Sequence, residues 1–353
     1  MENREYGFLH KKKEDKKLQI IGTQSIHFTQ APYILASASV VGKKEGEGPI
    51  GNEFDMICDT DKFGEDTWEE AESSLQKEST ALALGKSGLA PEDIRYIFAG
   101  DLLGQTIATS FGLMDYQIPL FRLYGACSTA GESMALGAMC VAGGYADHVL
   151  TVTSSHFASA EKQFRYPLEY ANQRPVSATW TVTGSGAYIL GTKKSDIKIT
   201  GLTPGRIVDY GVRDSMNMGA AMAPAACDTI YHHFCDFGTK PEDYDKIITG
   251  DLGYVGQEIL IKLLLDKGYD ISGVHTDCGI EIFDRQTQGT DSGGSGCGCA
   301  AVTLSAHFLK KIAQGEWEKI LFVPTGALLS TVSFNEGQNV PGIAHAVVIE
   351  HEE

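Results

Sequence analysis

One phrase of the sequence occurs twice. The first copy, residues 88–103, contains Gly88, Pro91-Glu92-Asp93 and Gly100-Asp101-Leu102. The second, residues 238–253, contains Gly238, Pro241-Glu242-Asp243 and Gly250-Asp251-Leu252 at the same spacing. Such a match indicates duplication of one supersecondary unit. The sequence therefore predicts a chain built from two similar halves.

The doubling continues into two turns of small residues, 125–131 and 293–299. Each turn leads into a helical stretch and then into an apolar strand, 148–153 in the first half and 319–324 in the second. Alignment on these strands places Cys127 opposite Gly298. The two halves therefore differ at the turn, where only the first has a thiol.

Helices and strands alternate in each half. Thr67 and Glu70 form a capping-box pattern that predicts a helix over 67–87, ended by Gly88, and its counterpart is expected to run from Pro224 to Gly238. Continuous apolar runs between helices are typical of parallel strands covered on both faces; they occupy residues 94–99, 119–124, 148–153, 246–249 and 319–324. Runs 185–190 and 343–349 are expected to add antiparallel strands.

The helices after Cys127 and Gly298 have few charges, which is typical of helices buried on all sides. We therefore expect an α/β fold of five layers, α-β-α-β-α, with two mostly parallel mixed sheets and buried central helices. The predicted divisions are a charged N-terminal arm, 1–17, an N-terminal half, 18–195, and a C-terminal half, 196–353.

Composition excludes several classes of function. A net charge of -17 repels phosphate backbones, so nucleic acid is not an expected partner. No apolar run is long enough to span a membrane, and no signal peptide is expected. The eight cysteines lack the paired spacing of a disulfide framework. Cys297 and Cys299 alone do not indicate zinc, and no metal site is predicted.

Cys127 is the first candidate for chemistry. A helix N-terminus lowers the pKa of a thiol, so a thiolate is expected at this turn, although a buried cysteine also serves simply to fill space. His156 is the candidate partner, with a structural hydrogen bond as the alternative. Asp101 and Asp251, which end the repeated strands, are expected to cap the following helices.

Residues 161–175 interleave aromatic rings with cations, including Arg165. Arginine makes paired hydrogen bonds to carboxylates and aromatic rings stack on flat molecules, so this segment suits a flat carboxylated ligand. A dimer-edge loop with exposed ion pairs explains the same composition. Both interpretations stay open at the level of sequence.

The duplicated halves and the elbow 125–129 resemble the thiolase superfamily, whose members join acyl groups through a cysteine thioester. Further strings resemble the stage V sporulation protein AD family of endospore-forming bacteria from about residue 18 onward. These strings are residues 100–103, 153–156, 163–167, 181–187, 221–226, 293–297 and 325–330.

The resemblance implies a protein that binds pyridine-2,6-dicarboxylate (dipicolinate), free or as its calcium chelate, for uptake into the spore and release at germination. It implies no resident cofactor, membrane-embedded sporulation partners, a peripheral position at the inner spore membrane of the developing spore, and a homodimer. The ligand site implied at the paired elbows consists of Cys127, Ser128, Thr129, His156, Arg165 and Gly298.

The sequence departs from the catalytic pattern of the superfamily. Condensing members have a histidine where Gly250-Asp251 stands, and an asparagine or histidine near Gly294. The resemblance therefore favours a non-catalytic receptor, with Cys127 as a vestigial nucleophile. Two alternatives remain open: an acyl-thioester condensing enzyme that uses Cys127, and an assembly surface for membrane partners with no ligand.

Overall fold

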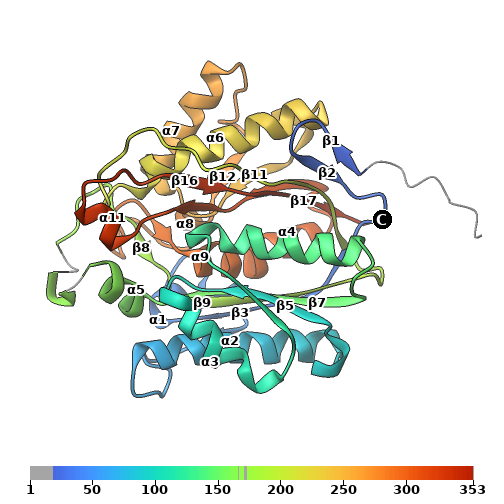
Figure 1. The fold of residues 1–353 in the computed structure, drawn as a ribbon, viewed down its shortest axis with the longest axis horizontal. Helices are drawn as coiled ribbons and strands as arrows, with labels where there is room; N and C mark the ends of the chain where they lie inside the picture. Colours follow the sequence, from blue (N-terminus) through green and yellow to red (C-terminus); the bar gives the residue numbers. More distant parts are fainter. Residues whose placement is uncertain (1–18, 166, 171–172, 353) are drawn as a thin grey trace, which may run out of the picture.

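The computed structural model describes residues 19–165, 167–170 and 173–352, so the predicted arm, 1–17, lies outside the described residues. Its secondary-structure elements form the five expected layers (Figure 1). The outer helices α2 (Trp68–Ser87) and α3 (Ile107–Leu113) cover one sheet, and α6 (Met218–Phe237) and α7 (Gly253–Asp266) cover the other. The predicted fold class is confirmed.

Each sheet has five main strands. The first sheet has the order β6 (Leu120–Leu123), β5 (Tyr96–Gly100), β7 (His148–Ser155), β9 (Gly184–Gly191), β3 (Tyr33–Val41). The second has the order β12 (His275–Asp277), β11 (Lys246–Thr249), β14 (Lys319–Val323), β17 (Ala346–His351), β10 (Ile197–Thr203). The pairs around β5 and β11 are parallel as predicted. One pair, Lys198 with Tyr33, joins the two sheets through β10 and β3.

The repeated phrase has the same local structure in both halves. Helices α2 and α6 each have 20 residues and end at glycines with positive φ, Gly88 at 69° and Gly238 at 67°. Only a residue without Cβ adopts this conformation at little energetic cost. Thr67 and Glu70 form the predicted capping box. The predicted start of α6 is wrong: Asn217 caps it upstream, and Pro224 lies inside the helix.

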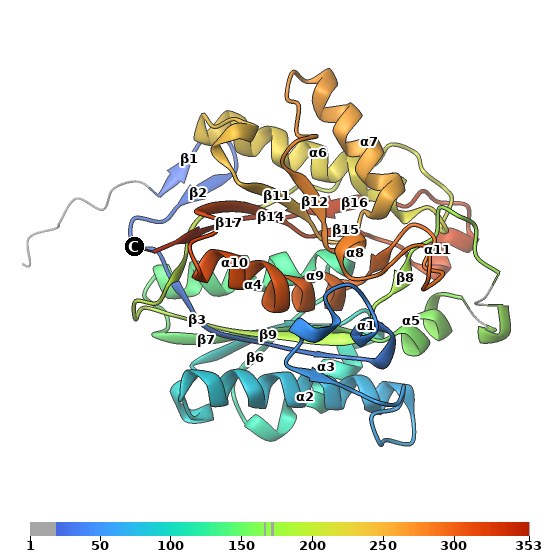
Figure 2. The same ribbon diagram turned by 180° about the vertical axis from the view of Figure 1, so that it is seen from behind.

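Helices α4 (Thr129–Ala142), α9 (Cys297–Thr303) and α10 (Leu309–Ala313) lie between the sheets, as the reverse view shows most clearly (Figure 2). A π-helical turn, Leu304–Phe308, joins α9 to α10. Small residues permit this close packing. A Cβ added at Gly186 on β9 would stand 2.8 Å from the Ala301 carbonyl carbon of α9. The central helices are therefore seated directly on the sheet backbone.

The predicted strand 343–349 is interrupted. Residues Gly342–Ala344 form β16, which pairs with β15 (Thr325–Ala327) outside the main sheets, and only Ala346–His351 joins the second sheet as β17. The small hairpin of β15 and β16 lies beside the elbow of the first half.

The remaining α-helices and strands are β1 (Ile20–Ile21), β2 (Ser25–His27), α1 (Lys43–Gly46), β4 (Met56–Ile57), α5 (Phe157–Phe164), β8 (Trp180–Thr181), α8 (Cys278–Glu281), β13 (Gly294–Ser295) and α11 (Thr331–Asn335).

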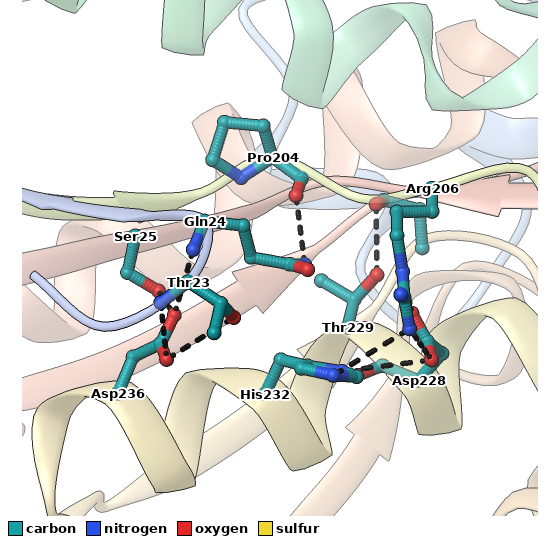
Figure 3. Close-up of polar contacts among 10 residues, drawn as sticks. Thr23, Gln24, Ser25, Pro204, Arg206, Asp228, Thr229, His232 and Asp236 are labelled. Carbon is teal, nitrogen blue, oxygen red and sulfur yellow. Dashed lines mark hydrogen bonds and ion pairs between the residues drawn. The ribbon is translucent and has the colours of Figure 1, made fainter.

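Residues 23–25, near the start of the described chain, are hydrogen-bonded to α6 of the other half (Figure 3). The Asp236 carboxylate accepts hydrogen bonds from the backbone N–H of Thr23 at 2.9 Å, the backbone N–H of Gln24 at 3.2 Å and the Ser25 hydroxyl at 2.8 Å. Charge-assisted bonds of this kind are the stronger hydrogen bonds in proteins.

Among the helices of the described ranges, none combines the length and hydropathy required to cross a membrane.

Candidate functional site

A cavity of about 600 Å³ lies at the elbow of the first half. Its walls come from both halves: Ala126 and Cys127 at the elbow, α5 with the residues that follow it, and segments 215–218 and 327–334 of the second half. Leu102, Phe164 and Phe334 give it apolar walls. Its volume and mixed lining are typical of small-molecule sites.

Cys127 is held on a tight 3₁₀ turn, Ala126–Ser128, in which Ala126 has a positive φ of 53°. Its side chain lines the cavity but is only 7% exposed. Burial raises the pKa of the Cys127 thiol well above its usual value, and the neighbouring Asp251 carboxyl group raises it further. The expected thiolate is therefore wrong: the helix N-terminus does not outweigh burial and an adjacent acid.

The acid next to Cys127 is Asp251, which follows strand β11. Its carboxyl group lies next to the Cys127 thiol and accepts hydrogen bonds from the backbone N–H of Gly296 at 3.0 Å and from the Thr325 hydroxyl at 2.7 Å. Burial raises the pKa of Asp251 to about 6. The helix-capping role predicted for Asp251 is wrong. At the start of α7 the Asp277 carboxyl group instead accepts hydrogen bonds from the backbone N–H groups of Leu252 and Gly253.

We expect Cys127 to react slowly with iodoacetamide, because only the thiolate is nucleophilic. At pH 8 its alkylation should be at least about tenfold slower than that of the exposed Cys235 on α6. Peptide mass spectrometry over time measures both rates in one sample. Asp251→Asn, which removes the adjacent charge, should accelerate alkylation of Cys127; equal rates for Cys127 and Cys235 in the wild type would contradict the structure.

His156 does not line the cavity. It is the N-cap of α5, where its Nδ1 accepts from the Ala158 N–H at 3.1 Å and its Nε2 therefore donates to the Asp61 carbonyl oxygen at 2.6 Å. Burial lowers the pKa of His156, which keeps the ring neutral. Both ring nitrogens of His156 make hydrogen bonds that hold the start of α5. The position of His156 therefore agrees with the alternative of a structural hydrogen bond.

Replacing His156 with alanine should therefore affect stability more than binding. Loss of a cap and a buried ring is expected to lower the free energy of unfolding by about 1–2 kcal/mol, with ligand affinity changed by less than about twofold. His156→Asn, which retains a capping oxygen, should recover part of the stability. Chemical denaturation measures the first effect, and a large loss of affinity without loss of stability would contradict this placement.

Three other predicted site residues also lie behind the cavity wall. The Ser128 hydroxyl donates to the Gly125 carbonyl oxygen at 2.7 Å, and the Thr129 hydroxyl donates to that of Ala126 at 2.7 Å. Both side chains are fully buried. Gly298 packs against the backbone of β7 and β9, where an added Cβ would stand 2.8 Å from the Ser155 nitrogen and 2.5 Å from the Gly184 oxygen. These residues shape the elbows without lining the cavity.

Arg165 does line the cavity, and the structure adds two charged neighbours to it. Its Nε lies 3.3 Å from one Glu161 oxygen, and Arg174 Nη1 lies 3.0 Å from the other. We call Glu161, Arg165 and Arg174 the arginine–glutamate triad. The Arg174 guanidinium also lies over the Trp180 ring at 5.4 Å. Residues 161, 163–165 and 174 thus supply part of the cavity wall.

Arg174 is the functional candidate that sequence reasoning did not single out. Its side chain is only 5% exposed, and its Nε has no hydrogen-bond partner among the described residues. A buried, unpaired donor on a charged group is costly unless a ligand satisfies it. The cluster of aromatic residues and arginines in 161–175 was the available signal, but it did not distinguish Arg174 from its neighbours.

The duplicated five-layer fold with a cysteine elbow places the molecule among thiolase-like proteins. Solved structures agree. Cerulenin-bound OleA of Xanthomonas campestris has a TM-score of 0.56 at 14% identity, covering 91% of this chain and 97% of that one. Human mitochondrial 3-ketoacyl-CoA thiolase in complex with CoA has a TM-score of 0.56 at 13% identity, covering 93% and 99%. These likenesses establish the fold alone.

Sequence comparison identifies the particular family. The family model for stage V sporulation protein AD matches residues 22–350. Stage V sporulation protein AD of Bacillus subtilis strain 168 is 41% identical over 333 residues, which cover 94% of this chain and 98% of that protein. The chain belongs to the stage V sporulation protein AD family and is a sporulation protein with a thiolase-like fold.

Proposed function

We propose that the protein is a receptor for dipicolinate, which it binds in the elbow cavity and helps to move into the developing spore and out of it at germination. The family resemblance motivates the choice of ligand. The observation that carries the proposal is a cavity with two arginines in its wall beside a cysteine that lacks a histidine or lysine partner among the described lining residues.

The chemistry of the walls suits a small aromatic dicarboxylate. Arg165 and Arg174 supply guanidinium groups to a carboxylate, and Leu102, Phe164 and Phe334 offer apolar surface to a flat ring. Arg174 is held between Glu161 and Trp180, so little side-chain entropy is lost when it binds. A cavity with a guanidinium group already held in position is suited to binding a carboxylate and supplies no group that activates a nucleophile.

Equilibrium dialysis of labelled dipicolinate against the purified full-length chain tests the proposal. Saturable binding at one site per chain is expected, and isophthalate, which has a similar outline but lacks the ring nitrogen, provides a competitor of matched charge. Absence of saturable binding in the presence and in the absence of calcium would overturn the proposal.

Acyl transfer through Cys127 is the alternative, because the thiol reaches the cavity. The raised pKa of Cys127 and the neighbouring Asp251 argue against a ready nucleophile. Intact-mass measurement after incubation with acyl-coenzyme A separates the two functions: an acyl adduct that disappears in Cys127→Ala would favour the enzyme.

Assembly forms part of the same proposal. Strand β6 is at the end of the first sheet, and large side chains on it or directly after it are exposed, including Phe121 at 52% and Tyr124 at 53%. We propose that this edge joins a second copy in a homodimer, which sedimentation measurements would detect. Contact with membrane-embedded sporulation proteins would then hold the dimer at the inner spore membrane.

A further inference from the structure

A second, smaller groove lies on the outer face of the first half, between the N-terminal part of α2 and α3. Its volume is about 290 Å³, and its lining includes three glutamates, Lys77 and two apolar side chains of α3. We call it the α2–α3 groove. It shares no residue with the described lining of the elbow cavity, so the proposed function leaves it unexplained.

Large apolar side chains are exposed along α3 and the 3₁₀ turn that follows it. Ile107, Phe111 and Met114 lie at positions i, i+4 and i+7, so they share one face of the helix. They are exposed to 39%, 62% and 55%. Exposed apolar side chains that gather on one face mark interaction sites. An amphipathic helix can dock on such a face through apolar residues at the same spacing.

The charge beside these apolar residues is negative. Residues 59–70 carry six acidic side chains and one lysine. Among the described residues, the groove carboxylates of Glu65 and Glu70 accept hydrogen bonds only from uncharged groups. Glu69 and Lys77 are each paired with a neighbouring residue of opposite charge. The groove therefore keeps an excess of negative charge that a cationic partner would complement.

We propose that the α2–α3 groove docks an amphipathic helix of a partner protein that is rich in lysine and arginine. The apolar face of that helix covers Ile107, Phe111 and Met114, and its cations face Glu65 and Glu70. The inference goes beyond the proposed function, because it does not require a ligand in the elbow cavity.

Two other occupants fit the charges less well. A twofold contact with a second copy would place the same glutamates opposite one another, because an isologous interface uses one patch twice. An anionic membrane surface would repel the carboxylates of Glu65 and Glu70. A basic helix meets both the apolar and the acidic part of the groove.

Fluorescence anisotropy with the full-length chain tests the proposal. The probe is a fluorescein-labelled peptide of leucine and lysine designed as an amphipathic helix, which should bind saturably, whereas a matched peptide of leucine and glutamate should not bind. Phe111→Ala should weaken binding of the basic peptide about tenfold. Leu265→Ala, which truncates an exposed apolar residue on α7, should change it by less than about twofold.

A second pair of variants separates the position of a charge from the net charge. Glu65→Lys should weaken binding about fivefold. Glu258→Lys, at an exposed position on α7, changes the net charge equally and should weaken binding by less than about twofold.

Equal losses in the two charge variants, or unchanged binding in Phe111→Ala, would overturn the proposal. A wild type that does not bind the basic peptide, together with a dimer that dissociates in Phe111→Ala on sedimentation, would assign the groove to a second copy and would also overturn it. Dialysis of dipicolinate reports on the proposed function separately, so failure of one proposal leaves the other standing.

Discussion

Replacing Arg174 with alanine is expected to weaken dipicolinate binding by about 30-fold, which corresponds to about 2 kcal/mol. The substitution removes a buried cation whose Nε has no partner among the described residues. It also leaves the Glu161 carboxylate with one guanidinium instead of two. Isothermal titration calorimetry measures the loss directly.

Two matched variants make this result interpretable. Arg285→Ala removes an exposed arginine that lies over Tyr254, away from the cavity, and should leave affinity unchanged. Arg174→Lys retains the charge but not the planar fork, so it should recover only part of the affinity. If Arg174→Ala binds dipicolinate as the wild type does while remaining folded, the triad is a structural ion cluster and the proposed site is wrong.

The second large effect concerns the fold. Gly298→Ala is expected to lower the free energy of unfolding by about 3 kcal/mol, because the new methyl group would meet backbone atoms of Ser155 and Gly184 at 2.8 and 2.5 Å. Backbone atoms of two packed strands cannot rotate aside as the end of a side chain can. Denaturant titration followed by circular dichroism measures the change.

Gly85→Ala provides the opposite control. Gly85 lies on the exposed side of α2, and a Cβ built there meets nothing within 4 Å. Alanine at this position should raise the free energy of unfolding by about 0.5–1 kcal/mol, since glycine weakens helix interiors. Equal effects of the two substitutions would show that the contact of α9 with the sheet is looser than the structure indicates.

The architecture could be predicted because the repeat carries strong local signals. Local signals predict most helices and strands without knowledge of their neighbours. These signals are the cap at Thr67, the helix ends at Gly88 and Gly238, and the continuous apolar runs of the strands. Where tertiary contacts decide, local reasoning failed. Pro224 looked like a first-turn residue, but packing of α6 extends the helix upstream to Asn217.

The candidate site was less predictable, because a cavity depends on directions that a sequence pattern does not specify. His156 follows a central strand and reads as a site residue, yet its ring turns back to cap α5. Asp251 repeats Asp101, which suggested a shared structural role, but it faces the Cys127 thiol. Arg174 enters the cavity from a segment with several similar cations, where only the fold distinguishes one from another.

A crystal structure of the full-length protein soaked with calcium dipicolinate tests the central claim most directly. The account predicts the ligand in the elbow cavity with a carboxylate bonded to the Arg174 guanidinium, its ring against the apolar wall and the Cys127 sulfur unmodified. Ligand bound elsewhere while this cavity remains empty, or a covalent adduct on Cys127, would contradict it.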